Sequence, residues 1–169
     1  MPDLASAAPF TRRVLAGIAS AGWQIDEDPD VVDDTAEEFS TLLTPPGGPI
    51  NWTVLVLVRP GVRGVVAYAA RPDDVPDDRV AAVAYAITMA NFGLPNGHFE
   101  LDLQDGELRA AAGVDLVDTD LSDHDLHQIV ASLFDTVGSM LGSYGDALES
   151  VIAGTDPGEA IAAAEASGV

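Results

Sequence analysis

Two valine-rich segments in the middle of the chain, Asn51–Val58 and Arg63–Ala70, place the strongest constraint on its fold. Valine favours extended backbone, and successive side chains of a strand point to opposite faces. Pro60–Gly61 separates the two segments closely enough for a tight connection. The sequence therefore predicts a β-hairpin, and we place its strands at the centre of a sheet.

The first of these strands is apolar on both faces. Alternation puts Leu55 and Leu57 on one face, while the other face carries Trp52, Val54, Val56 and Val58. A strand of this kind needs cover on both sides. We expect part of it to form an exposed apolar patch that another chain covers; the alternative is that the loop Leu43–Ile50 or the C-terminal segment covers it.

Apolar residues at helical spacing predict three helices. The first two are expected at residues 9–21 and at Arg79–Phe92, and the third begins after Ser122, with Asp125 placed for a capping box. Gly142–Ser143 is expected to interrupt this third helix, which then resumes for a turn or two at Tyr144–Ala153.

Strict alternation predicts three more strands. They are expected at Glu38–Leu43, Gly97–Leu103 and Glu107–Leu116. Asp105–Gly106 predicts a hairpin turn between the last two, and Trp23–Ile25 is interpreted as a brief strand or an extended entry.

These elements predict an α+β fold. We expect an antiparallel five-stranded sheet with helices packed mainly on one face, in the order α-β-β-β-α-β-β-α. Residues 10–153 are expected to form a single domain, with residues 1–9 and 154–169 as tails.

Charge limits the classes of partner. The chain has 28 acidic residues against 7 basic ones, a net charge of −21, and all its basic residues are arginine. Such a surface repels phosphates and anionic lipids, so we expect no nucleic-acid or membrane partner. The excess is spread along the whole chain, which favours adaptation to a salty cytoplasm, as in halophilic proteins, over one dedicated acidic site.

Several classes of site are excluded by missing residues and motifs. The chain has no cysteine, which removes disulfides, thiolate nucleophiles and cysteine-ligated metals. Met1–Ala8 lacks the basic start and apolar stretch of a signal peptide, so a cytoplasmic protein is expected. The sequence has no G-x-S-x-G motif, and we predict a protein without cofactor that is not an enzyme.

The competing hypothesis is an enzyme that depends on a metal or a small ligand. His124 and His127 stand three residues apart among aspartates, and both imidazoles could ligate a metal together with a carboxylate. A solvated start of a helix, flanked by acidic residues, explains the same pattern without any metal.

A stretch of the chain resembles the YbjN family and the wider group with the type III secretion chaperone-like fold. The resemblance lies in Val75–Arg109, where a helix ends at Ala90–Asn91 and is followed by Gly97, Phe99 and the Asp105–Gly106 hairpin. It implies a dimer-prone, chaperone-like or adaptor-like binding module, and it carries over no catalytic residues.

The leading hypothesis is therefore a non-enzymatic protein-binding module, chaperone-like or regulatory. Its partner would be another protein or a second subunit in a homodimer. The second predicted helix, with its small residues, is the expected dimer surface. The residues expected to contact a partner are Trp52, Val54, Val56, Val58, Val83 and Ile87.

Overall fold

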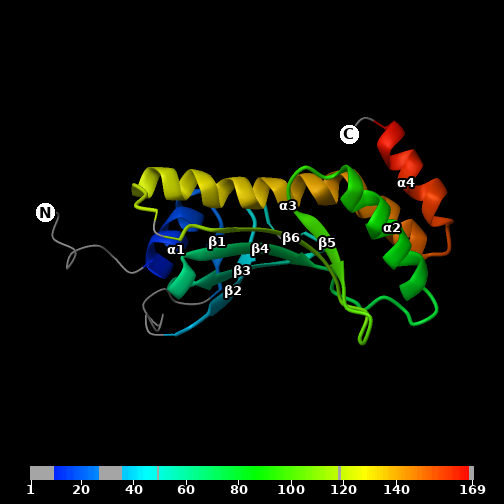
Figure 1. Ribbon diagram of the computed structural model, residues 1–169, viewed down its shortest axis with the longest axis horizontal. Helices are drawn as coiled ribbons and strands as arrows, with labels where there is room; N and C mark the ends of the chain where they lie inside the picture. Colours follow the sequence, from blue (N-terminus) through cyan, green and yellow to red (C-terminus); the bar gives the residue numbers. More distant parts are fainter. Residues whose placement is uncertain (1–9, 27–35, 49, 118, 168–169) are drawn as a thin grey trace, which may run out of the picture. The chain divides into compact units, whose positions relative to one another are not determined.

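The computed structural model describes residues 10–26, 36–48, 50–117 and 119–167 (Figure 1). The expected N-terminal tail, residues 1–9, lies outside this range. The helices within it are α1 (Phe10–Ser20), α2 (Val80–Gly93), α3 (Asp123–Ile152) and α4 (Pro157–Ala166). The strands are β1 (Gln24–Ile25), β2 (Phe39–Thr44), β3 (Thr53–Arg59), β4 (Gly64–Ala70), β5 (His98–Leu101) and β6 (Leu108–Asp115).

The strands form one antiparallel sheet in the order β1-β2-β3-β4-β6-β5. This confirms the α+β class, but the described sheet has six strands and not five. The extra strand is β1, whose Gln24 and Ile25 pair with Thr44 and Leu43 of β2. It lies within Trp23–Ile25, which the sequence indicated as a brief strand or an extended entry but which the expected count of five strands left out.

The described residues group into two compact units. Unit 1 takes its residues from Met1–Ile50, Val54–Ala67 and Gly113–Leu133. Unit 2 takes them from Asn51–Thr53, Tyr68–Ala112 and Phe134–Val169. Strands β3, β4 and β6 and helix α3 contribute residues to both units, and each unit is described in turn.

Unit 1 has a core between α1 and the strands. Val14, Leu15 and Ile18 of α1 are at most 2% exposed, which confirms the predicted helical stripe. Figure 1 shows α1 and the start of α3 on the same side of the strands of this unit. The two helices touch where His127 lies against Gly17, so closely that a Cβ atom at Gly17 would stand 2.6 Å from the His127 ring.

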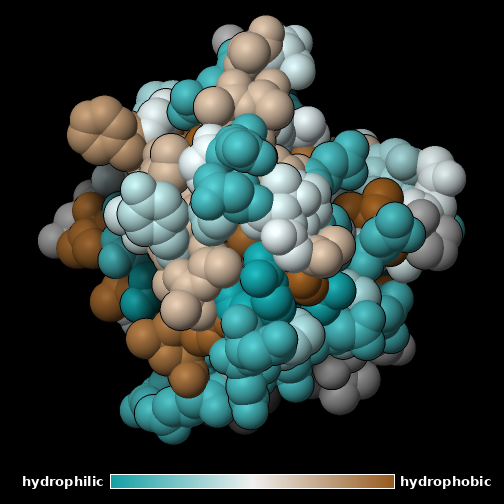
Figure 2. All heavy atoms as spheres, turned by 90° about the vertical axis from the view of Figure 1, so that its right-hand side faces the viewer, coloured by the Kyte–Doolittle hydropathy of each residue, from teal (hydrophilic) through white to brown (hydrophobic). Residues whose placement is uncertain are grey.

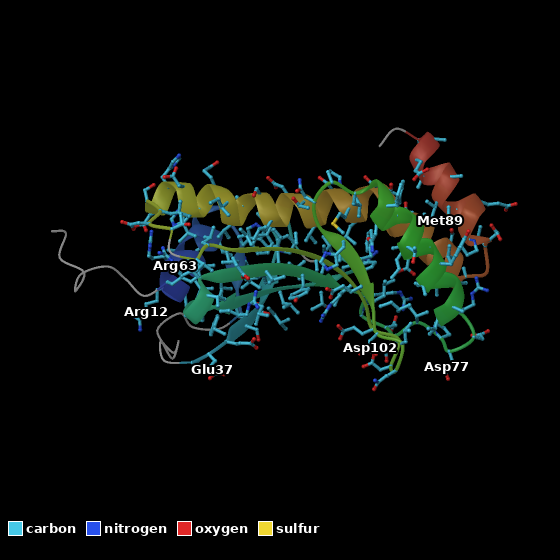
Figure 3. All side chains as sticks on the ribbon, viewed as in Figure 1. Arg12, Glu37, Arg63, Asp77, Met89 and Asp102 are labelled. Atoms are coloured by element: carbon cyan, nitrogen blue, oxygen red, sulfur yellow. The ribbon has the colours of Figure 1, made fainter. Side chains whose placement is uncertain are left out.

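Charged and aromatic contacts within unit 1 join α1 to residues that lie far from it in the sequence. Arg13 of α1 donates to Asp123 Oδ1 and to the carbonyl oxygen of Leu121, both at 2.6 Å. The Arg63 guanidinium lies 5.5 Å from the centre of the Phe10 ring, and Figure 3 shows this arginine beside α1. Unit 1 thus anchors the beginnings of α1 and α3 to each other and the β3–β4 turn to α1.

Unit 2 is built around α2, β5 and the second half of α3. Helix α2 packs on β5 and on α4. Phe99 of β5 is 2% exposed and meets the Tyr144 ring edge-on, with 6.3 Å between ring centres. Both backbone groups of Phe99 bond to Asn91 near the end of α2: Asn91 Nδ2 donates to the Phe99 carbonyl at 3.0 Å, and the Phe99 N–H donates to Asn91 Oδ1 at 2.7 Å.

Helix α3 is continuous through Gly142, so the predicted interruption at Gly142–Ser143 is wrong. A glycine inside a helix costs about 1 kcal/mol relative to alanine. Met140, Tyr144 and Leu148 on the inner side of the helix are at most 2% exposed. Their burial outweighs the low helix propensity of the glycines between them.

The C-terminal residues, expected to be a tail, include a packed helix. Asp156 caps α4 by accepting from the Glu159 N–H at 3.1 Å. Ile161 is completely buried and Ala160 is 6% exposed. Helix α4 thus adds to the core of unit 2 through α2, although its many alanines gave little amphipathic signal.

Candidate functional site

Three of the four valines predicted to contact a partner, Val54, Val56 and Val58, lie in the core of unit 1. Val56 and Val58 are fully buried, and Val54 is 5% exposed. Alternation along β3 was therefore interpreted correctly, but this set of side chains faces the helices. Their burial leaves them unavailable to a partner that docks on the folded chain.

The other predicted contact residues are also largely enclosed. Val83 is fully buried and Ile87 is 9% exposed, both on the side of α2 that serves the core of unit 2. Trp52, just before β3, is half-buried. Of the six predicted side chains, it alone keeps substantial exposed surface.

The opposite face of unit 1 carries apolar side chains that remain accessible. Leu42 of β2 is 47% exposed, and the register of β2 and β3 places it opposite Leu55. Leu57 and Val66, which alternate with buried neighbours on β3 and β4, are half-buried. We call Leu42, Leu55, Leu57 and Val66 the apolar strip.

An ion pair borders the apolar strip. Arg59 Nη2 donates to Asp115 Oδ1 at 2.8 Å. The pair passes directly over Gly64, where a Cβ atom would lie 2.5 Å from that same oxygen. Arg59 Nε is buried and has no hydrogen-bond partner. The strip thus ends at a charged border.

Unit 2 holds a connected cluster of charged side chains around Glu100. Arg109 lies opposite Glu100 in the register of β5 and β6, and its Nε donates to Glu100 Oε2. His98 Nε2 lies 2.8 Å from Glu100 Oε1, and Arg109 Nη1 donates to Glu107 Oε1 at 3.1 Å. The Arg109 guanidinium also stands 4.6 Å from the centre of the Tyr68 ring.

These contacts favour the charged forms of the two central groups. Partial burial acts to raise the pKa of Glu100, but the hydrogen bonds and charges of Arg109 and His98 together outweigh it, so the pKa lies below its ordinary value of 4.5. Burial acts to lower the pKa of Arg109, and contacts with Glu100, Tyr68 and Glu107 reverse that effect, so the pKa is raised. Both groups are therefore charged at neutral pH, which suits an ion pair better than a proton-transfer site.

Replacing Glu100 by glutamine is expected to destabilise the protein by no more than about 1 kcal/mol, because the pair is partly exposed. A lowered pKa in the folded state gives stability that is present above the unfolded pKa and lost as pH falls through the folded pKa. The difference in free energy of unfolding between wild type and E100Q should therefore be largest above about pH 5 and shrink toward about pH 3. Urea unfolding at several pH values measures it.

The matched control is D135N, which removes one carboxylate from an exposed position on α3. A constant difference between wild type and E100Q across this pH range would contradict the assigned role of Glu100.

The two histidines of the metal hypothesis do not converge on a site in the structure. His124 is exposed at the start of α3, whereas His127 is half-buried against Gly17, and its buried Nε2 has no hydrogen-bond partner. Within the described residues, no group of three or more histidines and carboxylates is placed to hold a metal ion. The metal hypothesis stays a prediction, which metal analysis of protein purified without chelator can test.

Sequence reasoning missed Leu42 and the pairing of Glu100 with Arg109. His98 and Glu100 alternate with apolar residues along their strand, but the register with the next strand was needed to bring Arg109 opposite Glu100. Opposite charges on two strands joined by Asp105–Gly106 were the available signal.

Comparisons with known proteins identified no relative of this chain. The chain matches no family model, and neither curated proteins nor solved structures gave a match. The resemblance to the YbjN family therefore stays a prediction. No helix in the described part of the chain combines the length and the apolar character needed to cross a bilayer.

Proposed function

We propose that this chain is a non-enzymatic protein-binding module, chaperone-like or regulatory, that receives a segment of another protein on the apolar strip of unit 1. The observation that carries the proposal is the exposure of Leu42, 47%, directly opposite Leu55 in the sheet. Apolar side chains that cluster on one face and remain exposed to solvent are typical of a surface that a partner covers.

The shape of the strip favours a segment over a small molecule. Leu42 and Leu55 stand side by side on neighbouring strands, and Ser40 lies opposite Leu57 in the same register. A small ligand would be poorly enclosed by side chains that lie side by side on an exposed sheet face. A segment with apolar residues on one side can cover it along its length.

The net charge of the chain indicates which residues should flank the apolar residues of the partner. The chain carries a net charge of −21, so a segment with arginine or lysine beside its apolar residues gains from long-range attraction. The chemistry expected of the partner is therefore an apolar segment flanked by basic residues. The YbjN resemblance, which implies a chaperone or adaptor, agrees with this proposal.

The test is capture of a partner on immobilised full-length protein, from an extract of the native cell at its native ionic strength. Mass spectrometry identifies the partner, and its affinity is then measured with the purified components. The variant L42E places a charge in the strip at an exposed position. We expect it to weaken binding of the identified partner at least about tenfold, on the scale of 1.4 kcal/mol per factor of ten.

The matched control is L103E, which adds the same charge at another exposed leucine, 69% exposed, in the β5–β6 turn. Circular dichroism shows that both variants are folded. Binding that survives L42E, or that L103E weakens equally, would contradict a docking site on the strip.

A further inference from the structure

One of the three asparagines of the chain, Asn96, is followed directly by a glycine. The pair lies between α2 and β5 in unit 2, where Asn96 is exposed and Gly97 is half-buried. Such a pair can react with itself, because the backbone nitrogen of the second residue can attack the side-chain amide carbon of the first. Glycine has no Cβ atom that would hinder its nitrogen.

Both groups that take part in this reaction are available. Among the residues that the structure describes, neither the Asn96 amide nor the Gly97 N–H takes part in a hydrogen bond. No bond therefore has to break before the nitrogen approaches the amide carbon.

The two other asparagines lack this combination. Both ends of the Asn91 amide bond to the backbone of Phe99, at 3.0 and 2.7 Å, and Asn91 lies within α2. Asn51 is exposed, but Trp52 follows it, and a bulky side chain beside the attacking nitrogen hinders its approach. The structure thus favours reaction at Asn96 alone.

The Asp105–Gly106 pair has the same spacing but a poorer reacting group. The side chain of an aspartate is ionised at neutral pH, and a carboxylate resists attack by a nitrogen far more than an amide does. Asp105 Oδ1 also accepts from the Glu107 N–H at 3.0 Å, which holds the side chain in the turn.

Ring closure at Asn96 requires a rotation of its backbone, which the preceding loop can take up. Gly97 itself is fixed: its φ is +73°, and a Cβ atom there would stand 2.6 Å from Met140 Sδ and 2.9 Å from the Ala111 carbonyl oxygen. In the described structure, the loop 94–96 has one backbone hydrogen bond, donated by the Leu94 N–H at 3.3 Å. A segment with so few backbone bonds opens readily.

We propose that Asn96 deamidates spontaneously and that one of the products loosens β5. The Gly97 nitrogen forms a bond to Asn96 Cγ and gives up its proton, the Cγ–Nδ2 bond breaks, and ammonia leaves with that proton. Water then opens the five-membered imide. Attack at Cγ gives aspartate, and attack at the backbone carbonyl carbon gives isoaspartate, whose main chain is one methylene longer. This inference concerns unit 2 and does not rest on the partner proposed for unit 1.

Isoaspartate is the product that disturbs the fold. An extra methylene directly before Gly97 displaces a residue that is already packed against Met140 and Ala111. The next residue, His98, begins β5 and pairs with Ala111 of β6. The aspartate form keeps the native length of the chain, so it should leave this pairing intact.

Both products also add a negative charge near the end of α2, a helix without charged residues of its own. Figure 2 looks onto the side where α2 and α4 lie in Figure 1, and it shows tan to white residues over these helices and teal residues gathered below them. A carboxylate near the C-terminal end of a helix is unfavourable. The variant N96D carries this charge on a chain of native length, so it separates the effect of charge from that of the longer chain.

Peptide mapping by mass spectrometry, after incubation of the purified full chain at mildly alkaline pH below its melting temperature, tests the site. Asn96 should be lost at least about tenfold faster than Asn51 or Asn91. Its products should be two peptides of equal mass, aspartate and isoaspartate, which chromatography separates. Comparable rates of loss at the three asparagines would overturn the assignment of the site.

Hydrogen exchange tests the effect on the fold. The amides of β5 should exchange faster in the incubated protein than in fresh wild type. Fresh N96D and N96A incubated for the same time should both keep the protection of fresh wild type, because neither contains isoaspartate. Unchanged exchange in β5 once isoaspartate has formed, or equal loss of protection in fresh N96D, would contradict the role given to the longer chain.

Discussion

The variant N91A is expected to lower the free energy of unfolding by about 2–4 kcal/mol, because it leaves two partly buried backbone groups of Phe99 without their partners. Asn91 accepts from one of these groups and donates to the other, so one amide side chain takes the place of a neighbouring strand along β5. Urea unfolding followed by circular dichroism measures the loss. Phe99 packs on Tyr144, so the near-ultraviolet signal should also weaken.

The control for this variant is N96A, at an exposed asparagine in the loop between α2 and β5. It should change stability by no more than about 0.5 kcal/mol. Equal losses from both variants would show that the amide of Asn91 has no special part in holding β5.

Raising NaCl from about 0.01 M to about 1 M is expected to stabilise the protein by about 3 kcal/mol, because the Debye length falls from about 30 Å to about 3 Å over this range. The charge of −21 then repels itself far less. For a chain of this size the gain corresponds to a rise in melting temperature of roughly 6–12 °C. Differential scanning calorimetry measures it.

Two controls separate screening from general effects of solutes. Sucrose at matched osmolarity should give a smaller rise, since it is uncharged and acts only by exclusion from the protein surface. At about pH 4, where many carboxylates are protonated, the salt effect should shrink. A melting temperature that stays flat in NaCl at neutral pH would contradict the importance of self-repulsion.

The parts of the fold that follow from local chemistry were predictable. Gly22, directly after the first predicted helix, has φ +88°, and Ser122 Oγ accepts from the Asp125 N–H at 3.2 Å, as the capping pattern predicted. Gly106 in the predicted hairpin turn has φ +86°. Each of these signals involves residues close in sequence, so their outcome depends little on tertiary structure.

Other elements depend on neighbours that the sequence does not specify. The two residues of β1 form a strand only because β2 lies beside them. Helix α3 passes Gly142 because residues buried on either side hold it, and α4 owes its place to packing on α2. Propensity is a weak guide in all three cases, since tertiary contacts override it.

The candidate site was missed for a related reason. Both faces of β3 are apolar, so alternation separates Val54, Val56 and Val58 from Leu55 and Leu57 without telling which set meets the helices. The polar Ser40, opposite Leu57, indicates which face of the sheet is more exposed to solvent. Pairing these two residues requires the register between β2 and β3. The long Pro45–Pro49 loop between these strands leaves that register open in the sequence. In α2 the exposure of Tyr85 and Phe92 could not be predicted for the same reason, because every side of the helix carries apolar residues.

The side chain of Asn91 also blocks the pairing of a further strand with β5, at one edge of the sheet. Beyond β5 the sequence of strands ends, and the backbone groups of Phe99 that could recruit a further strand already bond to this amide. At the other border β1 offers only two residues. Unprotected borders of this kind are where sheets of different molecules fuse into fibrils. Concentrated protein in high salt, with its mutual repulsion screened, should therefore remain free of fibrils.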